Sequence, residues 1–403
     1  MAEHKKVPSI RFKGFTDDWE RRKLGDISDS YSGGTPTAGK AEYYGGSIPF
    51  IRSAEVNSDT TELFLTDKGL KNSSAKMVKK GDILYALYGA TSGEVGLSRL
   101  DGAINQAILD IKPHEDYDAP FLMQWLRKSK ESIIGTYLQG GQGNLSGTIV
   151  TSLIVDCPNY DEQNQIGEFF ANIDNLIALY HCKHEKLLNV KRAMLDKMFP
   201  KEGEKVPKIR FKGFSDDWEQ HKLGDMIEYI VDNRGKNPRY YCTEGIPVID
   251  NYMIKNTLYP EINTANRFID EGLFESFIRK YNEKDDVLIT LVGNGIGNVT
   301  LFPDDKAVII QNTLGLRAKD DKRFLLFLLM AYNKKLLALD RGMAQPSIRQ
   351  DELLDLDIYV PDGEEQTKIG MYFVNLDNLS TLHQRKIEKL KNMKTAMLEK
   401  MFV

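Results

Sequence analysis

The sequence predicts an α+β fold in which two similar mixed domains are joined by two long helices. The helices are expected to pair as an antiparallel coiled coil, which gives the chain a pseudo-twofold, circular internal repeat. Two repeated blocks support this prediction. Residues 7–20 (VPSIRFKGFTDDWE) return as 206–219 (VPKIRFKGFSDDWE), and the helical stretch 172–199 returns at 375–402. Repeats of this kind determine the architecture of a chain, so they come before any local prediction.

The length and composition are those of a soluble protein with two domains. The chain has 403 residues, of which 41% are hydrophobic and 28% charged, and its formal net charge is −4. This charge argues against a strongly basic, non-specific coat for nucleic acid. Cys157, Cys182 and Cys242 have no metal-ligand spacing and are expected to be reduced thiols. The longest apolar run, 324–332, is too short to span a bilayer, and no secretory signal opens the chain, so we expect a cytoplasmic protein.

The repeated helical stretch carries apolar residues every seven positions. Ile166, Ile173 and Tyr180 begin this series in the first copy, and other apolar residues follow three positions later. Such a heptad pattern predicts a coiled-coil seam. The residues expected to pair the helices are Ile173, Leu176, Tyr180, Leu187, Val190 and Met194 in the first copy, and Leu376, Leu379, Leu390, Met393 and Met397 in the second. Lys183 and Lys386 are expected to interrupt this seam. The alternative is that each helix packs only on its own domain.

The order of the repeats predicts a circular arrangement. Val206 opens the repeat block that follows the first helix, and Val7 opens the same block at the start of the chain. The N-terminal block therefore stands where the chain would continue after the second helix, and the two termini are expected to lie close together. Trp19 and Trp218 are expected to be core residues at the joints between domain and helix.

The two mixed domains show the same order of short strands and glycine-rich turns, followed by a helix near 119–138 or 323–339. The expected organisation is a repeat block at 1–25, a first domain at 26–160, a helix at 161–200, a second block at 201–225, a second domain at 226–362 and a helix at 363–403.

Polar side chains gather at the strand ends and loops of both domains. Asparagine, glutamine and arginine form bidentate hydrogen bonds with the edges of DNA bases, so these loops are candidate DNA contacts. The alternative for each residue is a turn former or a solvated group. The candidates are Thr35, Arg52, Thr91, Ser92, Asn105, Gln106, Gln142 and Asn144 in the first domain, and Arg234, Lys236, Arg239, Asn251, Asn294, Asn298, Gln311, Asn312, Gln345 and Arg349 in the second.

Several short motifs occur in the same order in both halves. They include Trp-Glu-x-x-Lys-Leu-Gly-Asp at 19–26 and 218–225, and Glu-Gln-x-x-Ile at 162–166 and 365–369. With these motifs the chain resembles, over essentially its whole length, the specificity (S) subunit of type I restriction-modification systems. The second domain departs from the pattern, since residues 231–238 replace the Gly-Thr-Pro loop at 34–36.

The resemblance implies a non-catalytic subunit with two target recognition domains, each reading one half of a bipartite site in double-stranded DNA. It also implies that the long helices set the unread spacer and dock two methyltransferase (M) subunits, which restriction (R) subunits then join. No cofactor is expected on this chain, and S-adenosylmethionine, ATP and magnesium are implied for the partner subunits. No membrane partner is expected.

Other functions fit the sequence less well. Residues 293–298 resemble a dinucleotide fingerprint but lack its third glycine and a following helix, so no catalytic or metal site is predicted. A coiled-coil scaffold that binds no DNA stays open as an alternative. Basic residues of the first helix could face a partner, the DNA backbone or solvent. They are Lys183, Lys186, Lys191, Arg192 and Lys197.

Overall fold

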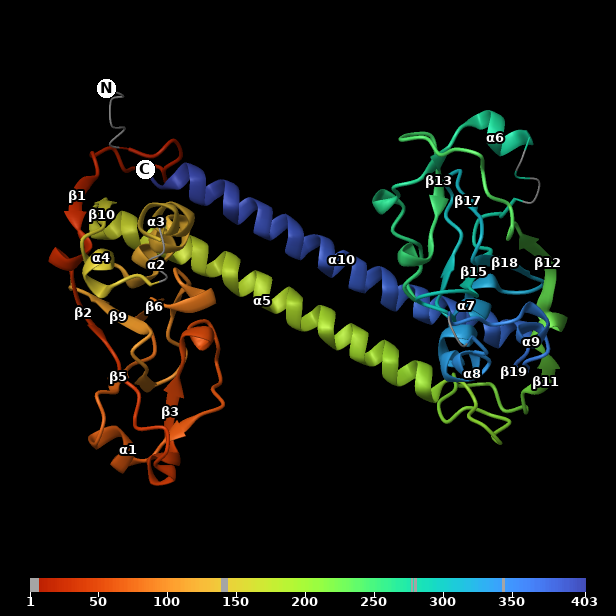
Figure 1. Cartoon of the computed structure of the whole chain (residues 1–403), viewed down its shortest axis with the longest axis horizontal. Coiled ribbons are helices and arrows are strands. Elements are labelled where there is room, and N and C mark those ends of the chain that lie inside the picture. The colour runs from red at the N-terminus through yellow and green to blue at the C-terminus, as the bar shows by residue number, and fades with distance from the viewer. Residues whose placement is uncertain (1–6, 139–143, 277, 279–280, 343–344) are drawn as a thin grey trace. The chain divides into compact units, whose positions relative to one another are not determined.

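The structure is a computed structural model that describes residues 7–138, 144–276, 278, 281–342 and 345–403. The chain forms two compact units (Figure 1). Unit 1 runs to Tyr180 and resumes at Lys386, and unit 2 is His181–Arg385. Each unit is a mixed α+β domain that includes part of both long helices, α5 (Tyr160–Lys197) and α10 (Gly363–Met401). The predicted α+β class with an internal repeat is confirmed.

Unit 1 contains short strands and helices that alternate along the chain. The strands are β1 (Glu20–Lys23), β2 (Ser28–Ser32), β3 (Tyr44–Ile51), β4 (Phe64–Leu65), β5 (Lys76–Val78), β6 (Ile83–Ala86), β7 (Val95–Leu97), β8 (Gly102–Ile104), β9 (Ile108–Pro113) and β10 (Ile154–Cys157). The helices besides the long pair are α1 (Asp67–Lys71), α2 (Ala119–Lys128), α3 (Lys130–Tyr137) and α4 (Gly147–Thr151). Among the described residues, the strands form the sheets β2-β9-β6-β7, β4-β3-β8-β5 and β1-β10, with β3 and β8 parallel.

Unit 2 repeats this plan. Its strands are β11 (Glu219–Lys222), β12 (Ile227–Asp232), β13 (Ile246–Ile249), β14 (Phe268–Ile269), β15 (Val287–Thr290), β16 (Val299–Leu301), β17 (Val308–Ile309), β18 (Thr313–Ala318) and β19 (Asp357–Val360). Its helices are α6 (Glu271–Ser276), α7 (Lys322–Ala331), α8 (Asn333–Ala338) and α9 (Gln350–Leu354). The sheets in the described part are β12-β18-β15-β16, β14-β13-β17 and β11-β19, with β13 and β17 parallel. Each sheet therefore has a counterpart in unit 1.

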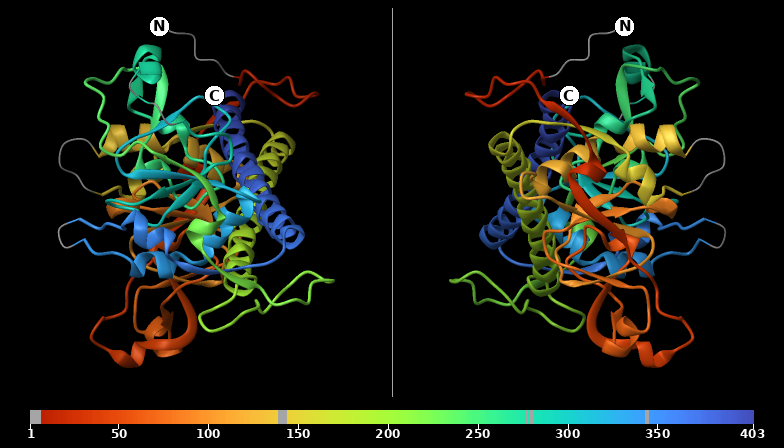
Figure 2. Two further views of the ribbon diagram at one scale, coloured as in Figure 1. Left: turned by 90° about the vertical axis from the view of Figure 1, so that its right-hand side faces the viewer. Right: turned by 90° about the vertical axis from the view of Figure 1, so that its left-hand side faces the viewer.

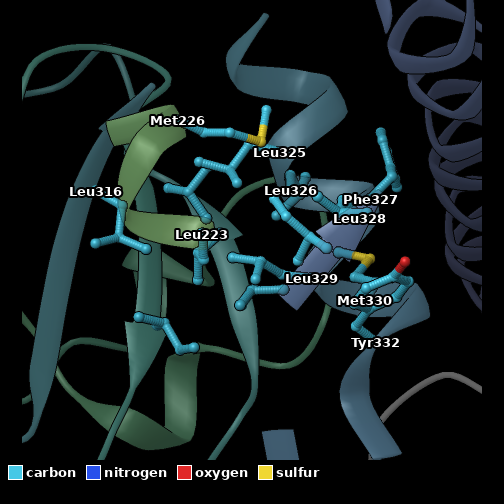
Figure 3. Packing of buried hydrophobic residues seen from close by; sticks show 14 of the residues in the cluster. Leu223, Met226, Leu316, Leu325, Leu326, Phe327, Leu328, Leu329, Met330 and Tyr332 are labelled. Carbon is cyan, nitrogen blue, oxygen red and sulfur yellow. The ribbon is translucent and has the colours of Figure 1, made fainter. Parts of the chain in front are cut away.

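Helices α2 and α7, at equivalent places in the two units, are capped in the same way. The carboxylate of Asp118 accepts a hydrogen bond of 2.8 Å from the backbone N–H of Phe121, and Asp321 accepts one of 2.8 Å from Phe324. An N-cap aspartate satisfies a backbone donor that has no partner within the helix. The apolar run that follows in α7 is buried at every position from Phe324 to Met330 and packs on the sheet that contains β16, β15 and β18 (Figure 3). No helix in the described ranges is long and apolar enough to cross a membrane.

The long helices pair antiparallel, as predicted. In unit 2, His184 of α5 lies 3.0 Å from the Ser380 hydroxyl of α10, and Lys191 forms an ion pair of 2.8 Å with Asp377. The contacting residue numbers increase along α5 and decrease along α10, so the two helices run in opposite directions. In unit 1, Lys394 of α10 forms the equivalent ion pair with Asp174 of α5, at 2.6 Å. Both pairs occupy the same positions of the repeat, since 174 and 377 are separated by the same 203 residues as 191 and 394.

The seam between the helices differs from the predicted one. Ile173, Met194, Leu376 and Met397 do pack against the unit cores, and Tyr180, Leu187 and Leu390 are half-buried. The prediction is wrong for four residues: Leu176, Val190, Leu379 and Met393 are 42%, 39%, 46% and 37% exposed. The seam instead uses positions four residues after the first heptad series, namely Ile177, His184 and Lys191 in α5 and Ser380, Ile387 and Lys394 in α10.

Polar seam positions are tolerated here because their partners lie across the helix pair. Lys191, which was expected to face a partner protein, the DNA backbone or solvent, instead forms an ion pair with Asp377. Lys183 and Lys386, expected to interrupt the seam, are exposed instead. An apolar pattern cannot identify such positions, since their burial depends on the residue opposite.

The circular arrangement appears directly within unit 1. The backbone N–H of Ile10 donates to the carbonyl of Lys400 at 3.0 Å, and Ile209 donates to Lys197 at 3.0 Å in unit 2. Figure 2 shows the N-terminal block beside the C-terminal end of α10. The start of the chain thus occupies, at the end of α10, the place that the second repeat block occupies at the end of α5.

Each joint contains a buried ion pair. Arg11 forms a bidentate pair with Glu162 in unit 1, and Arg210 does the same with Glu365 in unit 2, with neither carboxylate exposed. Bidentate arginine–carboxylate pairs combine charge with fixed geometry. Trp19 and Trp218 are buried, at 3% and 2% exposure, as predicted, and the indole N–H of Trp218 donates to Glu365 at 3.2 Å.

Candidate nucleic-acid interface

In unit 1, the three-residue turn between β8 and β9 carries one of the predicted residues to the surface. Gln106 is exposed at this turn, and its amide oxygen accepts a hydrogen bond from the hydroxyl of Thr35. Thr35 comes from the loop after β2 and precedes Pro36. Asn105 faces the turn itself, where its side chain accepts a hydrogen bond of 3.1 Å from the backbone N–H of Ala107. Two predicted residues, Thr35 and Gln106, are therefore brought together, while Asn105 shapes the turn.

The turn between β17 and β18 is the counterpart in unit 2. Ile309 and Ile104 occupy the same register against the parallel strand beside them, and each is followed, two residues on, by a glutamine, Gln311 or Gln106. The amide of Gln311 donates to the side chain of Asn237 in the loop after β12. Asn237 precedes Pro238 in the same way that Thr35 precedes Pro36.

The loop that sequence analysis regarded as a departure thus keeps the same contact. Thr35 stands three residues after Ser32, the end of β2, whereas Asn237 stands five residues after Asp232, the end of β12. The second loop is longer, yet its asparagine reaches the equivalent glutamine. Sequence analysis missed Asn237. The shared position before a proline was the available signal, because that residue is held extended.

A surface hollow of about 500 Å³ gathers half of the predicted residues of unit 2. Predicted residues that line it are Asn251, Asn294, Gln311, Asn312 and Gln345, and residues that the prediction missed are Asp250, Tyr252, Asn266 and Arg267. Asn251 is held by a 2.7 Å hydrogen bond from its amide to the carbonyl of Val292, while Asn294 is exposed. Several amides around one hollow are suited to recognising the polar edges of bases.

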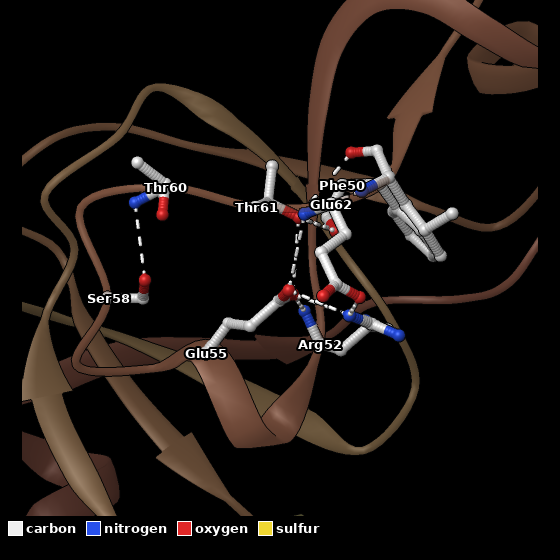
Figure 4. Close-up of polar contacts among 8 residues, drawn as sticks. Phe50, Arg52, Glu55, Ser58, Thr60, Thr61 and Glu62 are labelled. Carbon is white, nitrogen blue, oxygen red and sulfur yellow. Dashed lines mark hydrogen bonds and ion pairs between the residues drawn. The ribbon is translucent and has the colours of Figure 1, made fainter. Parts of the chain in front are cut away.

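Arg52 is not a free DNA contact. Its guanidinium donates to Glu55 at 2.8 Å and to Glu62 at 2.9 Å, as Figure 4 shows. Hydrogen bonds to Glu55 and then to Glu62 raise the pKa of Arg52. The counterpart position in unit 2 is Asp250, which pairs with Arg267. The position after β3 is therefore an arginine that binds carboxylates, and the equivalent position after β13 is a carboxylate that binds an arginine.

Three other predicted residues of the first domain and one of the second make structural contacts. Ser92 is buried and donates to the carbonyl of Leu87, Thr91 donates to the carbonyl of Tyr88, Asn144 forms an isolated bridge with Tyr88, and Asn298 bonds Asn256 and the carbonyl of Ile254. Burial of Ser92 rules out a base contact in this conformation, and the inward bonds of Asn298 make it a turn-forming residue. Gln142 lies outside the described residues.

The predicted cations of unit 2 are engaged to different degrees. Arg234 pairs with Asp232 at 2.7 Å and also bonds Gln350, and Arg349 forms an exposed pair with Asp351 at 2.7 Å. Lys236 is half-buried and Arg239 is exposed in the same loop. Charges already paired with a carboxylate contribute less to phosphate binding than unpaired ones, so Arg239 is the better candidate for a backbone contact.

The described residues contain no group of three or more histidine, cysteine, aspartate or glutamate side chains that could hold a metal ion. The cysteines are free thiols, and burial raises the pKa of Cys157 to about 12, which keeps it protonated and unreactive at neutral pH.

Comparison with known proteins matches both halves of the chain. The family model of the type I restriction modification DNA specificity domain matches residues 16–189 and 215–392. The type I restriction enzyme MjaVIII specificity subunit of Methanocaldococcus jannaschii is 24% identical over 402 residues, which cover 95% of this chain and 91% of that protein. The EcoR124I/EcoR124II specificity subunit of Escherichia coli is 24% identical over 176 residues, 41% of this chain and 43% of that protein.

Solved structures share the fold. The type I restriction-modification S subunit from M. genitalium aligns with a TM-score of 0.68 at 16% identity, covering 98% of this chain and 99% of that one. A chain from a structure of the assembly and conformational transition of the type I R-M system aligns with a TM-score of 0.54 at 17% identity, covering 95% and 97%. Because the family model covers most of the chain in two successive matches, the protein belongs to the type I restriction-modification DNA specificity family.

Proposed function

We propose that each unit reads one half of a bipartite site in double-stranded DNA, so that the chain specifies an asymmetric sequence with an unread gap. One observation carries this proposal. The same turns and loops of one fold, repeated twice in the chain, present different polar side chains, such as Thr35 in unit 1 and Asn237 in unit 2. A fold that is kept while its loops differ is suited to recognising two different sequences.

We also propose that the long helices dock two methyltransferase subunits and set the length of the gap. Support comes from the exposed apolar side chains that the seam leaves outside. Leu176 and Leu379 are 42% and 46% exposed, and Leu179 and Leu382 are each 46% exposed, at equivalent positions of the repeat. Apolar surface repeated in this way offers two copies of one partner the same contact.

On this proposal the chain recognises DNA and catalyses nothing itself. Methylation would use S-adenosylmethionine bound by the methyltransferase subunits, and restriction subunits that join the complex would use ATP and magnesium. The chain contributes the sequence specificity and the geometry of the docking surface.

The test is a map of methylated adenines in cells free of other methylation, made with this chain co-expressed with its methyltransferase. A single two-part motif with a fixed gap is the expected result. Exchanging residues 226–362 for the corresponding domain of a relative should change one half of that motif and leave the other intact. A stable complex that yields no new methylation would reject the proposal and favour a scaffold that binds only proteins.

A further inference from the structure

A glutamine occupies the same turn in both units although the surrounding loops differ. Gln106 and Gln311 each stand two residues after the strand that pairs in parallel with β3 or β13. The residue after each glutamine fixes the turn in the same way: the carbonyl of Ala107 accepts from Leu87 at 2.8 Å, and the carbonyl of Asn312 accepts from Leu291 at 2.8 Å. The two turns therefore share this backbone hydrogen bond, although only Gln311 has a positive φ.

The backbone of Gln311 suggests that its side chain is needed where it is. Its φ is +63°, in the left-handed region. The other non-glycine residues with positive φ in the described part of the chain are Asn256 and Asp285, which are types that tolerate this region. Glutamine has no such preference, and residues held in sparsely populated backbone regions concentrate at functional sites.

Each amide is held at one end and has bonding capacity left. A carboxamide oxygen accepts two hydrogen bonds and its nitrogen donates two. The oxygen of Gln106 receives one bond from Thr35, and the nitrogen of Gln311 gives one to Asn237. Both amides thus keep at least one acceptor site and one N–H with respect to these contacts. Orientation by a neighbouring loop reduces the entropy lost when a ligand binds.

We propose that Gln106 and Gln311 each read an adenine in the major groove, one in each half-site. This inference rests on the proposed function. An amide with one acceptor site and one N–H matches the N6 donor and N7 acceptor of adenine. The two half-sites, although different in sequence, would then both contain an A·T pair at the position contacted by this turn. Thr35 and Asn237 orient the reading amide, and the unlike residues of the neighbouring loops read the other bases.

The first experiment measures base preference. The wild-type chain and the variants Gln106→Met, Gln311→Met, Gln106→Glu and Gln311→Glu would be purified with the methyltransferase and used to select from randomised DNA. Each methionine variant keeps the side-chain length but has no amide. We expect each to relax one A·T pair, in one half-site only, with discrimination falling by about 5- to 150-fold. The glutamate variants should shift that position towards C·G, since a carboxylate accepts from the cytosine amino group.

A second experiment changes the DNA and leaves the protein intact, so that a folding defect cannot produce the result. Replacing the assigned adenine by 7-deazaadenine removes the N7 acceptor. The wild-type chain should bind this DNA more weakly than unmodified DNA, whereas the matching methionine variant should bind both DNAs with the same affinity.

The outcomes separate this inference from the function on which it rests. The absence of any two-part motif with the wild-type chain would reject the proposed function. A two-part motif whose preferences are unchanged in the methionine variants would overturn the reading role of the glutamines. Relaxation at a G·C pair, or a uniform loss of affinity across all positions, would overturn it as well, since the glutamines would then be structural.

Discussion

The buried ion pair between Lys191 and Asp377 allows a quantitative test of how the helix seam is stabilised. Both side chains are 12% exposed, their charged atoms lie 2.8 Å apart, and the ammonium of Lys191 lies 5.3 Å from the centre of the Phe327 ring. Burial raises the pKa of Asp377 despite the nearby lysine, which indicates that desolvation of the carboxylate outweighs its attraction to the ammonium. Such a pair should contribute little net stability, although losing one partner is costly.

We therefore expect Asp377→Leu alone to destabilise unit 2 by about 3–5 kcal/mol, because Lys191 stays buried without a counter-charge. The double variant Lys191→Met/Asp377→Leu should be between neutral and about 4 kcal/mol more stable than the wild type. Hydrogen exchange of peptides from α7 measures this, since Phe327 lies in that helix. Protection in the single variant should fall by at least about two orders of magnitude, at about 1.4 kcal/mol per tenfold change.

The equivalent pair in unit 1 is the matched control. Asp174 also accepts hydrogen bonds from Gln124 and Arg127, both at 3.1 Å. Replacing Asp174 and Lys394 together would leave those two donors without their acceptor, so the corresponding double variant should destabilise unit 1. If the double variant in unit 2 loses as much stability as the two single variants combined, the attraction between the charges exceeds their desolvation, and the reasoning fails.

The pH dependence of unit 2 gives a second check of the same pair. A carboxyl whose pKa is raised on folding binds a proton more tightly in the folded state than in the unfolded one. As pH falls from 7 through the folded pKa of Asp377 towards its usual value, the wild type should therefore gain stability relative to the double variant. Urea unfolding followed through α7 at pH 7 and near pH 4 would measure the difference, and a loss of relative stability would contradict the assignment.

Three further predictions follow from single contacts. Trp218→Phe should destabilise its unit by about 1.5–3 kcal/mol more than Trp19→Phe destabilises the other. The indole N–H of Trp218 donates to the buried carboxylate of Glu365 at 3.2 Å, whereas that of Trp19 has no partner among the described residues. Hydrogen exchange measured separately in each unit compares the two losses of stability, and equal losses would refute the reasoning. Burial raises the pKa of Asp110 to about 6, so unit 1 should gain up to about 3 kcal/mol relative to Asp110→Asn as pH falls from 7 to 4, measured by urea unfolding, and no gain would contradict it. Arg239→Ala should lower the slope of log affinity for DNA against log salt by about 1, and Arg234→Ala should lower it by less because Arg234 is paired with Asp232. Slopes equal to that of the wild type in both variants would mean that neither arginine contacts a phosphate.

The architecture could be predicted from the sequence because it is written twice. Duplicated blocks fixed the order of domain, helix, domain and helix, and the position of Val7 relative to Val206 predicted the joint that the hydrogen bond from Ile10 to Lys400 makes. These features depend on long stretches of similar sequence rather than on individual contacts. The same reasoning identified Trp19 and Trp218 as core residues, since large aromatic residues in repeated blocks mostly supply buried area.

Individual contacts could be predicted only in part. Thr35 and Gln106 were named separately, and their hydrogen bond depends on how the loop after β2 folds back over the next sheet. Arg52 was expected to face DNA because arginine suits that role, but its carboxylate partners at Glu55 and Glu62 are close in sequence and hold it. Residue type indicates what a side chain can bond, whereas its actual partner is set by the tertiary structure.

The helix seam is a second case in which residue type alone did not predict the contact. A search for apolar heptads selects leucines, and so it placed Leu176 and Leu379 in the seam and left out Lys191 and Lys394. The lysines are buried because each meets an aspartate on the other helix, and the leucines are exposed because the seam is already filled. A scattered exposed leucine needs no explanation. Exposed leucines at equivalent positions of both helices do, and the proposed docking of two copies of one partner would account for them.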